Sequence, residues 1–250
     1  MKYVIANLKM NFVSAKECDD YLVALGKAYG SKKGDATLIV CPSTLFAERF
    51  AHKLPTGVLL GGQDAFWESR GSFTGETSPQ ALKNIGAGAV ICGHSERRAH
   101  LGETDDMVSK KVEAAALAGL KAIVCVGETT EERSANDTAT VIIDQIMSAL
   151  SRVSPDHLEN IVIAYEPRWA IGAGVTPTTE EIMQVRIMIR KALSKKYGAE
   201  TAENVAILYG GSVKAAVMDE VCNDADMDGV LVGRESLDPD ELMKIYGVLT

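Results

Sequence analysis

Three residues with charged or acid–base side chains follow short apolar runs that lie far apart in the sequence. Lys9 follows YVIANL, His94 follows AVICG and Glu166 follows IVIAY. A carboxylate can remove a proton from a carbon next to a carbonyl group, while a neutral imidazole and an ammonium group stabilise the resulting oxyanion. General base catalysis contributes roughly 10²- to 10⁴-fold and each oxyanion donor about 10²- to 10³-fold, so only the combination gives a large acceleration.

Each of these residues also has a purely structural explanation. Lys9 could be a solvated charge at a strand end, His94 a hydrogen-bonded core histidine, and Glu166 a helix cap before a proline. One at a time, the three residues do not distinguish catalysis from structure. The distinction depends on the elements that position them.

Eight short apolar runs rich in β-branched residues predict eight strands. The runs are KYVIA, ATLIVC, GVLLGG, AVICG, AIVCV, NIVIAY, NVAILY and DGVLVG. Because they are nearly continuous in apolar residues, they are typical of parallel strands covered on both faces. The segments between them have helical spacing, as in the stripe Cys18, Tyr21, Leu22, Leu25 and Tyr29.

Alternation of strand and helix admits a closed barrel or an open doubly wound sheet. Eight units in 250 residues average about 31 residues each, and this even spacing favours the barrel. An open dinucleotide-binding sheet would need GxGxxG after an early strand, whereas the first run is followed by NLKMNF. We therefore predict a single (β/α)₈ barrel domain over residues 1–250, with eight parallel strands surrounded by helices.

In such a barrel the carboxyl ends of the strands form one ring, where catalytic side chains lie. The predicted ring contains Asn7, Lys9, His94, Glu96 and Glu166. Glycine-rich turns follow the last two runs, at YGGS and at Gly233, and barrels of this kind commonly hold phosphate there on backbone N–H groups. One such turn indicates little, but two in adjacent loops indicate an anion site.

Composition argues against several other functions. A net charge of −8 disfavours nucleic-acid or anionic-membrane binding, since both need a basic surface. No run approaches 18 apolar residues, and the four between Lys2 and Asn7 are too few for a signal peptide, so we expect a cytoplasmic protein. Five cysteines without CxxC fit reduced thiols, and four histidines without HxxxH or HExxH spacing indicate no metal site.

One connection, residues 64–79, is too long for a simple turn. Loops of this length usually have a binding or interface role, or are disordered. Phe66, Trp67 and Phe73 make it too apolar for a solvated loop, which predicts a partner surface. A self-packed Ω-loop is the alternative.

Along essentially its full length the chain resembles the triosephosphate isomerases. The resemblance rests on the ordered motifs NLKMN, FTGE, GHSERR, CVGE, AYEP.WAIG.G, YGGS and GVLVG. It implies interconversion of dihydroxyacetone phosphate and D-glyceraldehyde 3-phosphate, a place in glycolysis and gluconeogenesis, a homodimer and no cofactor.

The resemblance also implies roles for individual residues. Glu166 would shuttle the proton between two carbons, His94 would be the electrophile that faces the enediolate, and Lys9 the cation that completes the pocket. Asn7 would position Lys9 and the substrate, and Glu96 would hold Lys9 from behind.

Phosphate would be held by backbone N–H groups of Gly172, Ser212, Gly233 and Arg234. The tip of the 64–79 loop would insert beside the partner subunit's Asn7 and the partner subunit's Lys9. Its interface residues would be Phe73, Thr74, Gly75 and Glu76.

Seven residues depart from those usual in that family: Leu8, Phe12, Arg168, Ala173, Val175, Arg234 and Glu235. The Arg234 guanidinium could help hold the phosphate, or pair with Glu235 and point away, and we favour the pair. The resemblance also implies a lid at residues 167–177 with Arg168 in its first hinge, whose closure would exclude water and stop the enediolate from expelling phosphate.

Two other functions compete with an active triosephosphate isomerase. Another phosphosugar isomerase or epimerase on the same barrel is not expected to carry Lys9, His94 and Glu166 in this order. A non-catalytic phosphate-sugar-binding barrel or interaction protein is motivated by the departures, although every catalytic side chain is present.

Overall fold

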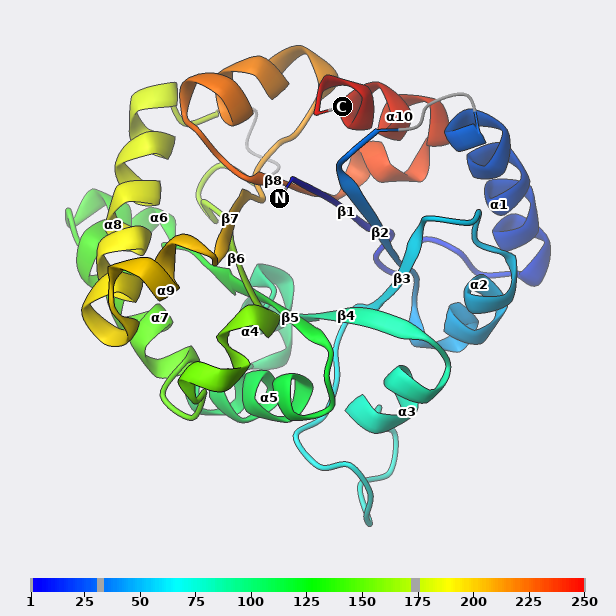
Figure 1. Cartoon of the computed structure of the whole chain (residues 1–250), viewed down its shortest axis with the longest axis horizontal. Coiled ribbons are helices and arrows are strands. Elements are labelled where there is room, and N and C mark those ends of the chain that lie inside the picture. Colours follow the sequence, from blue (N-terminus) through cyan, green and yellow to red (C-terminus); the bar gives the residue numbers. More distant parts are fainter. Residues whose placement is uncertain (1, 31–33, 172–175, 250) are drawn as a thin grey trace.

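All eight predicted runs form strands in the computed structural model, which describes residues 2–30, 34–171 and 176–249. The strands are β1 (Tyr3–Asn7), β2 (Thr37–Cys41), β3 (Leu59–Gly62), β4 (Ala87–Cys92), β5 (Lys121–Val126), β6 (Ile161–Tyr165), β7 (Ala206–Tyr209) and β8 (Gly229–Val232). Each strand pairs in parallel with the next, and β8 pairs in parallel with β1, so the sheet closes (Figure 1). The predicted (β/α)₈ barrel is confirmed.

Helices surround the strands (Figure 1). The α-helices are α1 (Ala15–Gly30), α2 (Ala47–Lys53), α3 (Pro79–Asn84), α4 (Ser95–Leu101), α5 (Asp105–Leu117), α6 (Thr130–Ser134), α7 (Thr138–Ala149), α8 (Thr179–Tyr197), α9 (Ala199–Glu203) and α10 (Pro239–Val248). Shorter helical turns are η1 (Thr44–Phe46), η2 (Pro155–Asn160), η3 (Ala215–Val217), η4 (Glu220–Asp224) and η5 (Arg234–Leu237). Among the described helices, none is long and apolar enough to cross a membrane.

Both faces of the strands are buried, as the continuous apolar runs predict. Successive residues of a strand point to opposite faces, so Val4 packs in the cluster shared with the helices and Ile5 packs in a separate inner cluster. The inner cluster consists of Tyr3, Ile5, Ile39, Cys41, Ala89, Ile91, Ile123, Cys125, Val162, Ala164, Leu208 and Leu231. Because side chains fill the barrel, a ligand site can form only at its ends.

The loop after β1 is packed into the core in spite of its two unusual residues. Leu8 is fully buried. Phe12 packs against Tyr21 of α1 and Phe50 of α2, with ring centroids 5.3 and 6.4 Å apart. These aromatic contacts give the loop a fixed path from β1 to α1.

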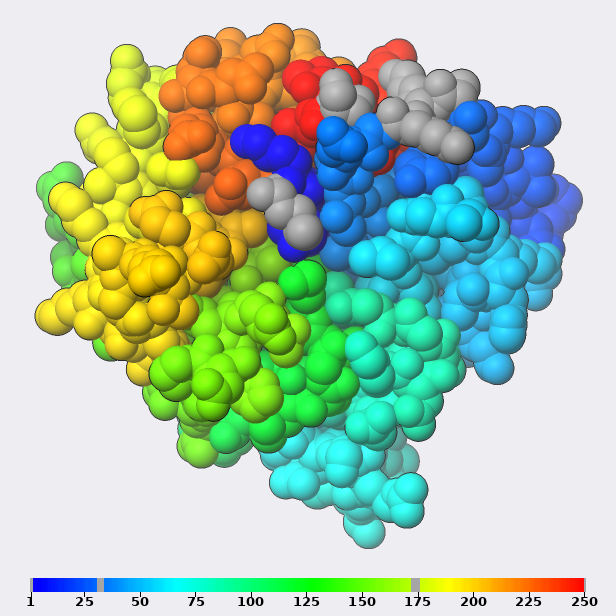
Figure 2. Space-filling view, viewed as in Figure 1, coloured from blue at the N-terminus to red at the C-terminus, as the bar shows by residue number. Residues whose placement is uncertain are grey.

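The 64–79 connection projects from the barrel beside α3 (Figure 1), and Figure 2 shows it as a protrusion from the surface. Phe66 stacks on Trp67 with ring centroids 3.9 Å apart and meets Phe73 at 4.6 Å. Residues 68–76 are nevertheless exposed, and Phe73 keeps 43% of its surface. The connection therefore packs on itself while an apolar residue stays exposed near its tip.

Buried charges anchor the start of this projection. The Lys111 ammonium, on α5, lies 2.8 Å from both carboxylate oxygens of Asp64 and 3.0 Å from Glu103. Burial raises the pKa of Asp64, and the charge of Lys111 opposes that shift. Removing one partner of such a network would leave a buried charge uncompensated, so the network holds the loop base in one position.

Candidate active site

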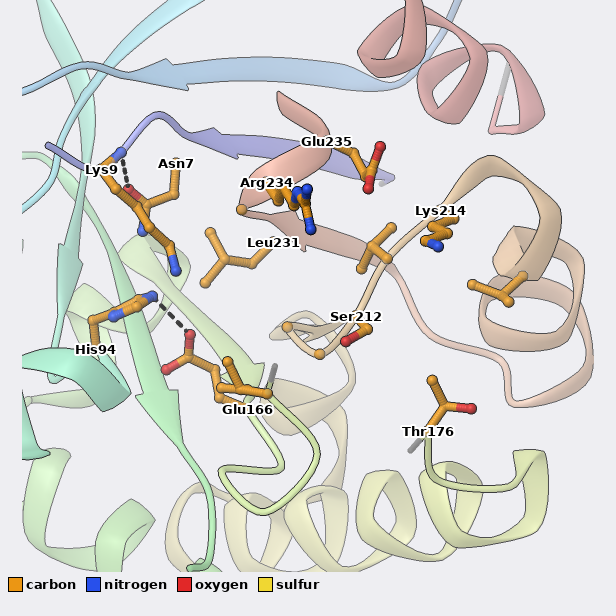
Figure 3. A pocket seen from close by; sticks show the side chains of 16 residues that line it. Asn7, Lys9, His94, Glu166, Thr176, Ser212, Lys214, Leu231, Arg234 and Glu235 are labelled. Atoms are coloured by element: carbon orange, nitrogen blue, oxygen red, sulfur yellow. Dashed lines mark hydrogen bonds and ion pairs between the residues drawn. The ribbon is translucent and has the colours of Figure 1, made fainter. Parts of the chain in front are cut away.

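A cavity of about 610 Å³ opens at the carboxyl ends of the strands (Figure 3). The predicted site residues that line it are Asn7, Lys9, His94, Glu166, Ser212, Gly233 and Arg234. Glu96 contacts Lys9 without lining the cavity. Gly172, the remaining predicted residue, lies outside the described residues. Thus the barrel brings together side chains that are as far apart in sequence as Asn7 and Arg234.

Glu166 and His94 face each other across the mouth of the barrel (Figure 3). Nε2 of His94 lies 3.0 Å from Oε1 of Glu166, and the Ser95 N–H donates to Oε2 at 2.9 Å. The Glu96 N–H donates to Nδ1 of His94 at 3.2 Å. Since Nδ1 accepts this bond, it carries a lone pair, and the ring proton sits on Nε2. His94 therefore presents a neutral N–H donor to the cavity.

Two glycines allow the Glu166 backbone to lie between neighbouring strand ends. The Glu166 N–H donates to Val126 at 2.8 Å, and the Gly210 N–H donates to Tyr165 at 2.7 Å. A Cβ at Gly127 would lie 1.8 Å from the Glu166 carbonyl oxygen, and one at Gly210 would lie 2.9 Å from its Cγ. Close backbone approach thus explains the glycines of CVGE and YGGS beside this carboxylate.

A buried thiol lies next to the same carboxylate. Cys125, on β5, faces the barrel interior and is 1% exposed. Burial raises the pKa of the Cys125 thiol well above its usual range, and the Glu166 carboxylate raises it further. Cys125 therefore stays a protonated thiol against Glu166.

Lys9 is held in an unusual backbone conformation. Its φ is 51°, in the left-handed region that costs a non-glycine residue about 1–3 kcal/mol. Its N–H donates to Oδ1 of Asn7 at 3.1 Å, and the Gln63 amide donates to its carbonyl oxygen at 2.9 Å. The Lys9 ammonium pairs with Glu96. Gln63 was not predicted, because a residue that acts by bonding a backbone oxygen leaves no pattern in the sequence.

The turn after β8 lies against Lys9 and closes the anion side of the cavity. A Cβ at Gly233 would lie 3.3 Å from Cε of Lys9. Ser236 is fully buried, and its hydroxyl donates to the carbonyl oxygens of Gly233 and Asn7 at 2.6 and 3.2 Å. Arg234 begins η5 without a positive φ, so the substitution of a usual glycine causes no left-handed strain there.

The predicted ion pair between Arg234 and Glu235 is wrong. Both side chains belong to the described residues, and no ion pair or hydrogen bond joins them (Figure 3). Instead both line the cavity, together with Lys214, which sequence reasoning also missed. Adjacent residues in a 3₁₀ turn point in different directions, so neighbouring positions alone do not make a pair.

A second buried carboxylate, Glu128, fixes the chain that leaves Glu166. It accepts hydrogen bonds from the Tyr165 hydroxyl at 3.1 Å and the Trp169 indole at 2.9 Å. Arg133 stacks on the Trp169 ring at 3.8 Å. Burial raises the pKa of Tyr165, and the Glu128 carboxylate raises it further. Glu128 was not predicted, although the CVGE motif contains it.

No group of three or more His, Cys, Asp or Glu side chains is placed to hold a metal ion in residues 2–30, 34–171 and 176–249. All five cysteines are free and buried. At the cavity the Glu166 carboxylate lies against a neutral imidazole, with the Lys9 ammonium group among the other lining residues. Such a set suits proton transfer next to a carbonyl of a small anionic molecule.

Comparison with known proteins gives one consistent family. The family profile described as triosephosphate isomerase matches residues 2–249. The chain is 43% identical over 242 residues to the triosephosphate isomerase of Alkaliphilus oremlandii, covering 97% of each chain. It is 48% identical over 190 residues to that of Thermoanaerobacter pseudethanolicus, covering 76% and 77%, and 43% identical over 219 residues to that of Roseiflexus castenholzii, covering 87% and 86%.

Proposed function

The chain belongs to the triosephosphate isomerase family, and on this premise we propose how its own residues perform the family's reaction. That reaction interconverts dihydroxyacetone phosphate and D-glyceraldehyde 3-phosphate, an aldose–ketose isomerisation. One observation carries the proposal: Glu166, the neutral N–H of His94 and the Lys9 ammonium converge on one cavity. The family is itself a standard example of a glutamate base paired with a neutral histidine.

Glu166 acts as the base. Its carboxylate removes a proton from the carbon next to the substrate carbonyl and returns it to the neighbouring carbon. The carboxylate contacts His94 and accepts the Ser95 N–H, and both contacts hold it aimed across the barrel mouth. Substrate would take the place of the His94 contact.

His94 and Lys9 stabilise the enediolate oxygens. The Nε2–H of His94 donates to the oxygen on which charge develops, and it can do so because the Glu96 N–H occupies Nδ1. The Lys9 ammonium supplies positive charge, and Glu96 holds it from behind while Asn7 fixes its backbone. The substrate phosphate is held by N–H groups of Ser212, Gly233 and Arg234, with Gly172 as a fourth donor.

A coupled isomerase assay on purified protein tests this function. We expect turnover of both triose phosphates by the unmodified chain. A non-catalytic phosphate-sugar binder, the competing function, would instead bind inorganic phosphate with no turnover above that of the Lys9→Ala variant. The intact arrangement of Lys9, His94 and Glu166 disfavours that alternative, since a mere binder has no use for the base.

The proposal places the enzyme in the cytoplasm and in glycolysis and gluconeogenesis, as a homodimer. Exposed apolar side chains on the loops after β1, β2 and β3 support the dimer, because contact with a partner would remove their apolar surface from water. Met10 is 87% exposed, Val13 79%, Leu45 84% and Phe73 43%. The projecting residues Phe73, Thr74, Gly75 and Glu76 would insert beside the partner subunit's Asn7 and the partner subunit's Lys9.

We expect Thr74→Arg to break the dimer. The charge and bulk of arginine at the tip of the projection would have to be buried in the partner, at a cost that an apolar contact cannot offset. Light scattering after gel filtration should give about twice the 26.8 kDa chain mass for the unmodified protein and a single chain mass for the variant. Thr140→Arg, on the exposed side of α7, is the matched control and should stay dimeric. A dimeric Thr74→Arg protein would rule out this loop as the contact.

We expect Arg168→Val to change kcat less than tenfold. The Arg168 N–H donates to the Glu128 carbonyl at 3.1 Å, and valine keeps that bond. The guanidinium forms no hydrogen bond or ion pair within the part of the chain that the structure describes. A hinge substitution can alter the rate of lid closure without changing the chemistry, and steady-state kinetics measures its effect on kcat. A larger loss would show that the guanidinium acts in lid closure.

A further inference from the structure

Two of the cations that line this cavity form no ion pair with a described residue, although the chain as a whole is acidic. The net charge of the chain is −8, yet cations outnumber carboxylates among the charged lining residues, which are Lys9, Lys214, Arg234, Glu166 and Glu235. Lys9 is already paired with Glu96. Lys214 and Arg234 form no ion pair with any residue that the structure describes. Two unpaired cations thus face a site whose ligand is an anion.

Arg234 combines a fixed backbone with a side chain that forms no ion pair with a described residue. Its turn is held by Ser236, whose hydroxyl bonds Gly233 and β1 and whose carbonyl oxygen accepts from the Tyr21 hydroxyl at 2.9 Å. The side chain lines the cavity and points toward the space that the other lining residues enclose (Figure 3). Its neighbour Glu235 does not neutralise it. The guanidinium is therefore available to a ligand at the Gly233 end.

We propose that the Arg234 guanidinium binds the substrate phosphate directly and is a specificity-determining group of this site. The inference rests on the proposed function and deepens it, because the donors implied by the family resemblance are neutral backbone N–H groups. A guanidinium adds charge-assisted, bidentate hydrogen bonds to a phosphate that carries nearly two negative charges at neutral pH. With this contact, the phosphate group contributes more to the preference for a phosphorylated substrate than it would through backbone N–H groups alone.

Lys214 also lines the cavity and provides a comparison for Arg234. It lies two residues beyond Ser212, on the loop after β7, whereas Arg234 is adjacent to Gly233 and is itself one of the proposed N–H donors. A direct contact depends on position, while a long-range field depends on charge. Equal substitutions at the two cations therefore separate the two effects.

The test compares Arg234→Gln with the unmodified enzyme on D-glyceraldehyde 3-phosphate and on D-glyceraldehyde, which lacks the phosphate. We expect the ratio of the two kcat/KM values to fall about tenfold or more, because a hydrogen bond to a charged group is lost only with the phosphorylated substrate. The inhibition constant of inorganic phosphate should rise by a similar factor. Arg234→Lys keeps the charge but loses the planar guanidinium fork. Its kcat/KM ratio and its phosphate inhibition constant should therefore lie between those of the unmodified enzyme and those of Arg234→Gln.

Lys214→Gln is the matched control, with an expected change in the same ratio below about threefold. An unchanged ratio and an unchanged phosphate inhibition constant in Arg234→Gln would overturn the proposal, and so would an equal effect of Lys214→Gln. Calorimetric titration with inorganic phosphate tests the Arg234 contact separately from the isomerase function. If the unmodified protein has no isomerase activity while Arg234→Gln still weakens phosphate binding about tenfold, the function fails and the phosphate contact stands.

Discussion

Replacing Glu166 by glutamine is expected to lower kcat by about 10⁴-fold, at the upper end of what a general base contributes. Glutamine has nearly the same shape, and its amide oxygen can still accept the Ser95 N–H that now bonds Oε2 at 2.9 Å. It cannot accept a proton from carbon at neutral pH. The variant should therefore fold normally and bind phosphate, yet fail in the chemical step.

Three measurements separate the loss of the base from a loss of structure. Steady-state kinetics gives kcat, inhibition by inorganic phosphate reports the anion site, and thermal unfolding reports the fold. Glu48→Gln on α2, whose side chain is 78% exposed, is the matched control and should keep full turnover. If Glu166→Gln retained turnover within tenfold, the proton would have to pass through another group.

Lys9→Ala is expected to lower kcat/KM by about 10³-fold. The substitution removes the cation nearest the developing oxyanion, and it also leaves the Glu96 carboxylate without the partner it now has. An unpaired negative charge beside a forming enediolate raises the barrier further. The loss should therefore exceed that of a neutral oxyanion donor.

A second variant distinguishes these two contributions. The double variant Lys9→Ala/Glu96→Gln lacks the carboxylate that Lys9→Ala leaves unpaired. Its kcat/KM should therefore be about tenfold higher than that of Lys9→Ala alone. Lys16→Ala, an exposed lysine paired with Asp20 on α1, should have no effect on turnover. Full activity of Lys9→Ala, or a further loss in the double variant, would contradict the role given to this cation.

The substitutions Glu166→Gln and Lys9→Ala also distinguish an active isomerase from a non-catalytic phosphate-sugar binder. Both residues line the cavity, but only catalysis requires the carboxylate of Glu166 to change its protonation state. A binder would lose affinity in Lys9→Ala and none in Glu166→Gln. An isomerase would lose turnover in both while its phosphate affinity survives in Glu166→Gln.

Several contacts within the site could not be predicted from the order of residues. Gln63 fixes the left-handed backbone of Lys9, and Glu128 holds Trp169, because distant strand ends place these groups within hydrogen-bonding distance. Neither contact has a sequence spacing of its own. The expected pair of Arg234 with Glu235 fails for the converse reason, since adjacency in sequence does not bring the two side chains together in the turn that begins η5.

Sequence by itself determined the barrel and the ring of polar residues at its mouth. Burial of a parallel strand on both faces demands a continuous apolar run, and eight such runs at even spacing leave few folds that bury them all. The polar residues after those runs then have to meet at one end. Tertiary structure alone decided which other groups they contact: that Nε2 of His94 lies against Glu166, that Gln63 bonds the Lys9 carbonyl oxygen, and that the Arg234 guanidinium forms no ion pair with a described residue at the cavity. Apolar periodicity is a local property of the chain, whereas a hydrogen bond or ion pair depends on distances of a few ångströms between segments that only the closed barrel brings together.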